Sequence, residues 1–130
     1  MAVGGRGLLI EGPPGVGKSS LAVALIDRGA VLVGDDGVLL VLRGERVHAS
    51  PAPGIAGKLE VRNVGLLDFP ILSDVPVALV LRLDPAAPRF RETPEWLERA
   101  GVQLPAIDLW PDSPVLALRA ELALRTYGLR

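Results

Sequence analysis

The chain has 130 residues, of which 49% are hydrophobic and only 4% aromatic, which excludes a disordered chain and predicts one α/β domain over residues 1–130. The 14 basic and 15 acidic residues leave a formal net charge of -1, which argues against a module that binds nucleic acid or an anionic membrane by bulk electrostatics. With no cysteine and one histidine, the sequence excludes disulfides, thiolate metal sites and multi-histidine metal sites. No apolar run approaches the ~18–20 residues that span a bilayer, so we expect a cytoplasmic protein.

The first half of the chain alternates short apolar runs with glycine-containing turns. Residues 7–11 predict a buried strand that a Gly/Pro-rich turn closes. Apolar residues recur on one face of 18–28 and a glycine follows directly, which predicts a helix. Residues 30–34 predict a second apolar strand, and 38–42 with 46–49 predict a hairpin around a glycine-containing loop. We therefore expect a strand–helix–strand unit followed by a hairpin.

The second half is predicted in the same way. Two prolines and two glycines predict a loop over 50–57, and the apolar runs 59–67 and 78–83 each predict a strand. A Thr-Pro start and a glycine end predict a short helix over 93–101. A run rich in Leu and Ala predicts a final amphipathic helix over 115–127.

The turn after the first strand matches the P-loop pattern G-x-x-x-x-G-K-[ST] at every fixed position. It consists of Gly12, Pro13, Pro14, Gly15, Val16, Gly17, Lys18 and Ser19, and Ser20, which follows, is also predicted to bind the nucleotide. Glycines permit the dihedral angles that aim several backbone N–H groups at one anion, and the following helix adds its N-terminal dipole. Lys18 would reach the β- and γ-phosphates and the Ser19 hydroxyl would bind Mg²⁺. A glycine-rich turn that binds nothing has no need of Lys-Ser, so the motif predicts a nucleoside triphosphate or related polyphosphate site.

Two adjacent carboxylates, Asp35 and Asp36, follow the second predicted strand. If that strand is parallel to the first, the right-handed crossover brings both strand ends to one sheet edge, beside the P-loop. Adjacent side chains of a strand point in opposite directions, so one carboxylate would reach Mg²⁺ or Lys18 and the other would accept a proton from an incoming hydroxyl. Asp-Asp-Gly is also ordinary turn chemistry, and spacing alone leaves both interpretations open.

A carboxylate and a guanidinium lie two residues apart in the strand predicted over 59–67. Alternation places Glu60 and Arg62 on one face of that strand. These groups suit a metal ion and a phosphate, respectively. A solvated strand face explains them equally well.

Taken in order along the chain, these motifs resemble the C-terminal catalytic domain of HPr kinase/phosphorylase. That family shows a P-loop, a Val-Ala-Asp-Asp strand end and a Leu-Glu-Ile-Arg-Gly-Leu-Gly-Ile-Ile signature, where this chain has Val-Leu-Val-Gly-Asp-Asp and Leu-Glu-Val-Arg-Asn-Val-Gly-Leu-Leu. The resemblance covers about residues 3–70 and is greatest to the short bacterial form that lacks the N-terminal domain. It implies a P-loop-containing α/β fold of the HPr kinase / PEP carboxykinase-like class, with a mostly β central sheet and flanking helices.

The resemblance also implies an activity and a set of roles. The family uses ATP and Mg²⁺ to phosphorylate a serine of the phosphocarrier protein HPr in the phosphotransferase system, reverses the reaction by phosphorolysis, and is typically hexameric. The implied roles are nucleotide binding by residues 12–19, contact of Lys18 with the transferred phosphoryl group, Mg²⁺ binding by Ser19 and Glu60, acid–base catalysis by Asp36 beside Asp35, and a place in the site for Arg62 and Gly65.

Two other functions stay open. A small-molecule kinase of the P-loop class would need a lid, for which the loop Arg89–Phe90–Arg91 is the candidate. A regulatory module that binds ATP without transferring phosphate is favoured by Asn63, which stands where the family signature has glycine, and by the lack of a histidine before the P-loop in this sequence.

Overall fold

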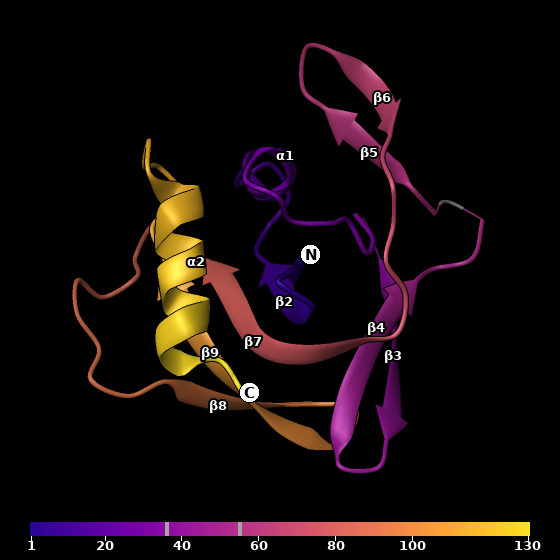
Figure 1. The fold of residues 1–130 in the computed structure, drawn as a ribbon. Helices are drawn as coiled ribbons and strands as arrows, with labels where there is room; N and C mark the ends of the chain where they lie inside the picture. The colour runs from indigo at the N-terminus through magenta and orange to yellow at the C-terminus, as the bar shows by residue number, and fades with distance from the viewer. Residues whose placement is uncertain (36, 55) are drawn as a thin grey trace.

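The computed structural model describes residues 1–35, 37–54 and 56–130, and it has a mixed α/β fold (Figure 1). The helices are Lys18–Asp27 (α1) and Leu116–Tyr127 (α2), and a separate hairpin consists of Lys58–Val61 (β5) and Gly65–Asp68 (β6). The main sheet consists of Ala2–Val3 (β1), Arg6–Glu11 (β2), Val38–Arg43 (β3), Arg46–Pro51 (β4), Val75–Leu83 (β7), Glu95–Arg99 (β8) and Val102–Leu109 (β9). Its order is β1-β2-β7-β4-β3, with β9 beside β7 and β8 beside β9.

The central strand is β7, which is almost wholly buried and strongly apolar, as expected for a strand covered on both faces. It pairs in parallel with β2 on one side, where Glu11 lies opposite Arg82, and with β9 on the other, where Arg82 lies opposite Asp108. Its first two residues pair antiparallel with β4. The carboxyl ends of β2, β7 and β9 therefore lie along one edge of the sheet, where ligands bind in α/β folds.

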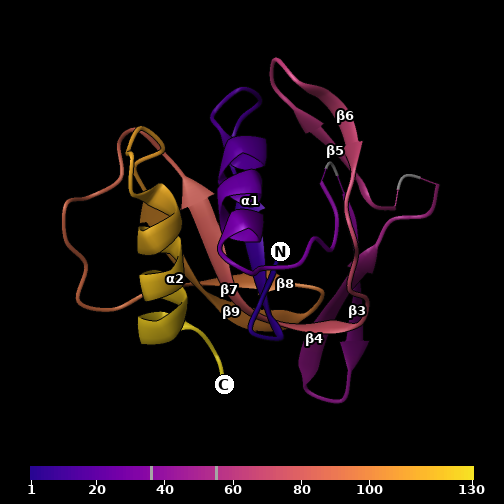
Figure 2. The ribbon, with the colours of Figure 1, turned by 45° about the horizontal axis from the view of Figure 1, so that its top comes forward.

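Each face of the sheet carries its own apolar cluster. Both helices cover one face, where Leu21 and Leu25 of α1 and Ala120 of α2 pack with Leu79 and Leu81 of β7. Figure 2 shows the two helices side by side over these strands. The cluster on the other face consists of Ala2, Val33, Val47, Ala49, Val75, Val77, Val80, Leu104 and Ala106. Neither helix in the described part of the chain is long and apolar enough to cross a membrane.

In the first half of the chain, most predicted elements are confirmed. The strand predicted over 7–11 is β2, the helix over 18–28 is α1, and the hairpin over 38–49 is β3–β4. The prediction of a strand over 30–34 is wrong. Within that segment, Val31 makes an isolated bridge to Ala2 and Leu32 makes another to Ile71. These two single bridges go to different partners and do not form a continuous ladder, so the segment is not a strand of the sheet. The parallel neighbour of β2 is β7 instead.

The second half departs further from the sequence-based expectations. The helix predicted over 93–101 is the strand β8, whose side chains alternate between half-buried and exposed, and β9, which we did not predict, returns beside it. The single strand predicted over 59–67 is the hairpin β5–β6, and the loop predicted over 50–57 starts two residues late because β4 runs to Pro51. The strand over 78–83 and the helix over 115–127 are confirmed as β7 and α2.

Candidate functional site

The P-loop joins the end of β2 to the start of α1, and its glycines determine its path. Gly15 and Gly17 have φ values of 79° and 113°, in the left-handed region that glycine tolerates. Gly12 has no room for a side chain, because a Cβ there would lie 2.8 Å from Val16 Cγ1 and 3.2 Å from the Leu83 carbonyl oxygen. Gly17 is the N-cap of α1 and no side chain of the described residues caps it. The N–H groups of the first helical turn are thus available to an anion.

Lys18 and Ser19, the first residues of α1, turn their polar groups toward the loop and toward the segment that follows the helix. Lys18 Nζ donates a hydrogen bond of 2.8 Å to the Gly12 carbonyl oxygen, which folds the ammonium group back over the P-loop. Ser19 Oγ donates to Asp35 Oδ1 at 3.1 Å. Asp35 is therefore brought to the P-loop as predicted, although the segment before it is not a strand of the sheet.

Two cavities meet at Lys18, Ser19 and Asp35, which line both. The first, the sheet-side cavity, has a volume of about 400 Å³ and is also lined by Met1, Leu8, Leu9, Ile10, Glu11, Gly12, Ala22, Gly34, Gly37, Val38 and Leu40. The second, the P-loop cavity, has a volume of about 430 Å³ and is also lined by Pro14, Gly15, Gly17, Ser20, Glu60, Arg62 and Asn63. Of the predicted nucleotide-binding residues, Pro13 and Val16 line neither cavity.

The β5–β6 hairpin supplies the far wall of the P-loop cavity. Leu59 is fully buried in the cluster beneath α1, and because neighbouring side chains of a strand alternate, Glu60 faces away from that core and lines the cavity. Arg62 lines it too, but from the turn after β5 and not from a shared strand face as predicted. In that turn the Val64 N–H donates a hydrogen bond to the Val61 carbonyl oxygen. Asn63, the third residue of the turn, has φ 69°, the positive value that a type II turn requires at that position.

One predicted site residue stands apart from this cavity. Gly65 begins β6 with φ 134° and lines a separate hollow on the hairpin, together with Glu60, Val64 and Leu66. Asp36 lies outside the described residues, so its predicted role as the base stays a prediction.

The oxygen donors at this junction suit a magnesium ion that arrives with a nucleotide. Mg²⁺ takes oxygen ligands and is usually held by one or two carboxylates together with substrate phosphates and water. Ser19, Asp35 and Glu60 offer a hydroxyl and two carboxylates around the P-loop cavity. No group of three or more His, Asp or Glu side chains in the described part of the chain could hold a metal ion by itself. The donor set therefore fits a nucleotide-borne Mg²⁺ better than a resident metal.

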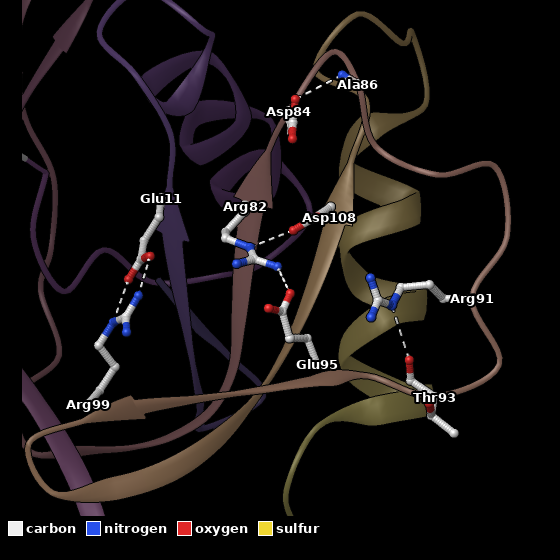
Figure 3. A network of polar contacts seen from close by, with 9 residues as sticks. All are labelled: Glu11, Arg82, Asp84, Ala86, Arg91, Thr93, Glu95, Arg99 and Asp108. Carbon is white, nitrogen blue, oxygen red and sulfur yellow. Dashed lines mark hydrogen bonds and ion pairs between the residues drawn. The ribbon is translucent and has the colours of Figure 1, made fainter.

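A row of ion pairs crosses the sheet edge just before the P-loop (Figure 3). Arg99 donates two hydrogen bonds to the Glu11 carboxylate, of 2.7 Å from Nη2 and 3.1 Å from Nε. Arg82 donates from Nε to Asp108 Oδ1 at 2.5 Å and from Nη2 to Glu95. The hydrogen bond that Arg82 donates to Glu95 raises the pKa of Arg82 and lowers the pKa of Glu95.

This row of ion pairs was not predicted from the sequence. Glu95 and Arg99 reach it only because β8 is a strand, with Glu95, Leu97 and Arg99 turned to the same side. The sequence carries no clear signal for it, because the apolar residues Trp96 and Leu97 are adjacent and the segment does not alternate between polar and apolar residues.

The known proteins that resemble this chain in sequence or in structure all point to one family. A family model described as the HPr serine kinase C-terminal domain matches residues 1–73. An HPr kinase/phosphorylase of Streptococcus sanguinis is 34% identical over 120 residues, which cover 82% of this chain and 39% of that protein. One of Alkaliphilus metalliredigens is 45% identical over 76 residues, which cover 58% of this chain and 25% of that protein. The solved structure of the HPr(Ser) kinase/phosphatase from Coxiella burnetii matches with a TM-score of 0.80 and 29% identity, over 92% of this chain and 81% of that one.

These matches differ in how much of each relative they include. This chain spans 39% or less of the two curated relatives named above, but most of the solved Coxiella burnetii chain.

Proposed function

The chain belongs to the HPr serine kinase C-terminal domain family, and on this premise we propose that it transfers a phosphoryl group from ATP to a serine of the phosphocarrier protein HPr. The proposal includes the reverse phosphorolysis, in which inorganic phosphate removes the phosphoryl group from phosphoserine as pyrophosphate. The observation that carries it is the convergence of Lys18, Ser19, Asp35 and Glu60 on one cavity at the N-terminus of α1. This is the set of charges and hydroxyls that phosphoryl transfer needs.

Different groups of the P-loop cavity would bind different parts of the triphosphate and its metal ion. Backbone N–H groups at the start of α1 would donate to the phosphate oxygens. Lys18, now bonded to the Gly12 carbonyl oxygen, would turn its ammonium group to the β- and γ-phosphates. The Ser19 hydroxyl and the carboxylates of Asp35 and Glu60 would hold Mg²⁺, which when bound neutralises charge on the transferred phosphoryl group.

The sheet-side cavity is the proposed entrance for the serine hydroxyl. It shares Lys18, Ser19 and Asp35 with the P-loop cavity, so a hydroxyl placed in it would lie next to the terminal phosphate of a nucleotide bound there. Asp36, the next residue along the chain, is the proposed base that accepts the hydroxyl proton, on the strength of the family resemblance. Little further covalent chemistry is required, because phosphoryl transfer depends mainly on positioning and on charge stabilisation.

Labelled ATP, Mg²⁺ and purified HPr test the proposal directly. We expect label on HPr with the parent protein, none with Lys18→Ala, and a loss of at least about a hundredfold in rate with Asp36→Asn. Lys58→Ala is the matched control, because Lys58 is an exposed lysine that pairs with Asp68 outside both cavities, and it should leave transfer unchanged. Tight ATP binding by the parent without transfer to HPr would refute the kinase and favour a regulatory ATP-binding module. Full transfer by Asp36→Asn would refute the base alone.

A further inference from the structure

An acidic residue stands directly before the P-loop. Glu11 is the last residue of β2, and it lines the sheet-side cavity together with Lys18, Ser19 and Asp35. Its side chain is 33% exposed, so the charge of its carboxylate is only partly screened by water. Lys18 Nζ lies 2.8 Å from the carbonyl oxygen of Gly12, the residue next to Glu11. A free carboxylate at this place would repel a bound triphosphate and compete with it for the Lys18 ammonium group.

Arg99, which comes from a distant part of the chain, forms an ion pair with the Glu11 carboxylate. It is the last residue of β8, and its guanidinium meets both Glu11 oxygens in a two-pronged contact, at 2.7 and 3.1 Å (Figure 3). The neighbouring Arg82 is already engaged by Asp108 and Glu95. Among the described residues, Arg99 is therefore the cation that serves Glu11. The bond to Glu11 also raises the pKa of Arg99, so the guanidinium stays charged under all ordinary conditions.

We propose that Arg99 is a positioning residue for nucleotide binding, which holds the Glu11 carboxylate at the sheet edge and cancels its charge beside the P-loop. The inference rests on the proposed nucleotide site and adds the β8–β9 hairpin to it. By this mechanism the sheet-side cavity keeps the positive charge of Lys18 available to the terminal phosphate. The chain can then carry an acidic residue at the entrance of an anion site without weakening it.

A purely structural role makes a different prediction. Both partners are about one-third exposed, and such ion pairs contribute little to stability. If the pair only ties the β8–β9 hairpin to β2, then removing either partner loosens the same contact and changes nucleotide affinity in the same direction. If Arg99 acts through the charge of Glu11, the two removals have opposite effects. The sign of the change therefore separates the two roles.

The Kd for MgATP, measured by calorimetry at low salt, provides the test. Arg99→Gln leaves Glu11 uncompensated and should raise the Kd about fivefold to tenfold, whereas Glu11→Gln leaves a spare guanidinium and should lower it about threefold. The double variant should return to within about twofold of the parent. Arg28→Gln is the matched control, because it removes the same charge from an exposed pair with Glu121 at the far end of α1. Its Kd should stay within about twofold of the parent.

Each remaining outcome decides one question. Single variants that both raise the Kd, or that both leave it unchanged, overturn the role of Arg99 while the nucleotide site stands. If Arg99→Gln does not fold, Glu11→Gln alone decides, and a raised or unchanged Kd overturns the inference. A parent protein that does not bind MgATP, or that binds it equally well as Lys18→Ala, refutes the proposed function, and this inference falls with it. The effect of Arg99→Gln should also shrink toward none at about 0.5 M salt, because screening weakens partly exposed charges.

Discussion

Substituting Gly34 with alanine tests how closely the segment that carries Asp35 is packed. A Cβ at residue 34 would lie 2.6 Å from the Gly37 carbonyl oxygen and 2.9 Å from Val38 Cγ1. The first of these neighbours is backbone and cannot rotate aside, so the chain between 34 and 38 must move. Overpacking of this kind costs about 1–3 kcal/mol of unfolding free energy. For a chain of this length that is a fall in Tm of roughly 3–12 °C.

The same movement should reach the nucleotide site. Asp35 follows directly and accepts a hydrogen bond from Ser19, so Gly34→Ala should also raise the Kd for MgATP, by about tenfold if that contact is lost. Gly37→Ala is the matched control: its Cβ would meet only Ala52 Cβ, at 4.0 Å, and neither glycine has a positive φ. It should leave stability within about 0.5 kcal/mol or raise it slightly. Thermal unfolding by circular dichroism and calorimetric titration measure both effects. Equal Tm and equal Kd in the two variants would refute the reasoning.

Three further substitutions test other parts of the structure. Ser19→Ala should raise the Kd for ATP about tenfold with Mg²⁺ present and less than about twofold with EDTA, because the lost hydroxyl acts on the metal; equal changes in both titrations would contradict this. Arg82 lowers the pKa of Glu95, so the ionised carboxylate stabilises the fold above the pKa of unfolded glutamate, and this gain is lost as pH falls through the lowered value. Glu95→Gln should therefore lower the Tm at pH 7 by an amount that shrinks as the pH falls through the lowered pKa of Glu95, and a difference that stays constant as the pH falls would argue against the pairing. Ala100→Asn should raise the Tm by a few degrees, because Ala100 and Gly101, with φ 50° and 82°, form a two-residue hairpin turn that favours Asn-Gly. A fall in Tm, which the same substitution would cause in a helix, would refute the turn.

The parts of the fold that the sequence predicts correctly depend on local signals. In the P-loop, the glycines, the lysine and the serine are consecutive, and the strand before them and the helix after them have clear apolar periods. β3–β4 is likewise a local hairpin, with its loop glycine at φ 62°. None of these elements needs a distant segment to determine its type. Their positions along the chain were therefore predictable to within a few residues.

The position of Asp35 was predicted correctly from an incorrect intermediate. We expected a strand parallel to β2 to carry it to the P-loop, whereas residues 30–34 make only isolated bridges, to Ala2 and Ile71. The Ser19–Asp35 hydrogen bond shows that the carboxylate reaches the loop all the same. Which segment pairs with β2 depends on competition among distant strands, and β7 wins because it is a longer and more deeply buried apolar run. That competition is not visible in the spacing of residues 30–35.

The strand β8 shows how a local signal can mislead about the site itself. Thr93, Pro94 and Gly101 form a plausible helix start and stop, and intrinsic propensity does not oppose it. Residues 95–99 form a strand instead of a helix because they pair antiparallel with β9 along their whole length. This pairing turns Glu95 and Arg99 to the same side, toward the sheet edge. In a helix these two side chains, four residues apart, would share a face beside each other and not reach separate strands. As a strand, the segment delivers Glu95 to Arg82 on β7 and Arg99 to Glu11 on β2. The misassigned element is thus the one that carries a distant positive charge to the start of the P-loop, and the opposite-sign test at Glu11 and Arg99 depends on β8 being a strand.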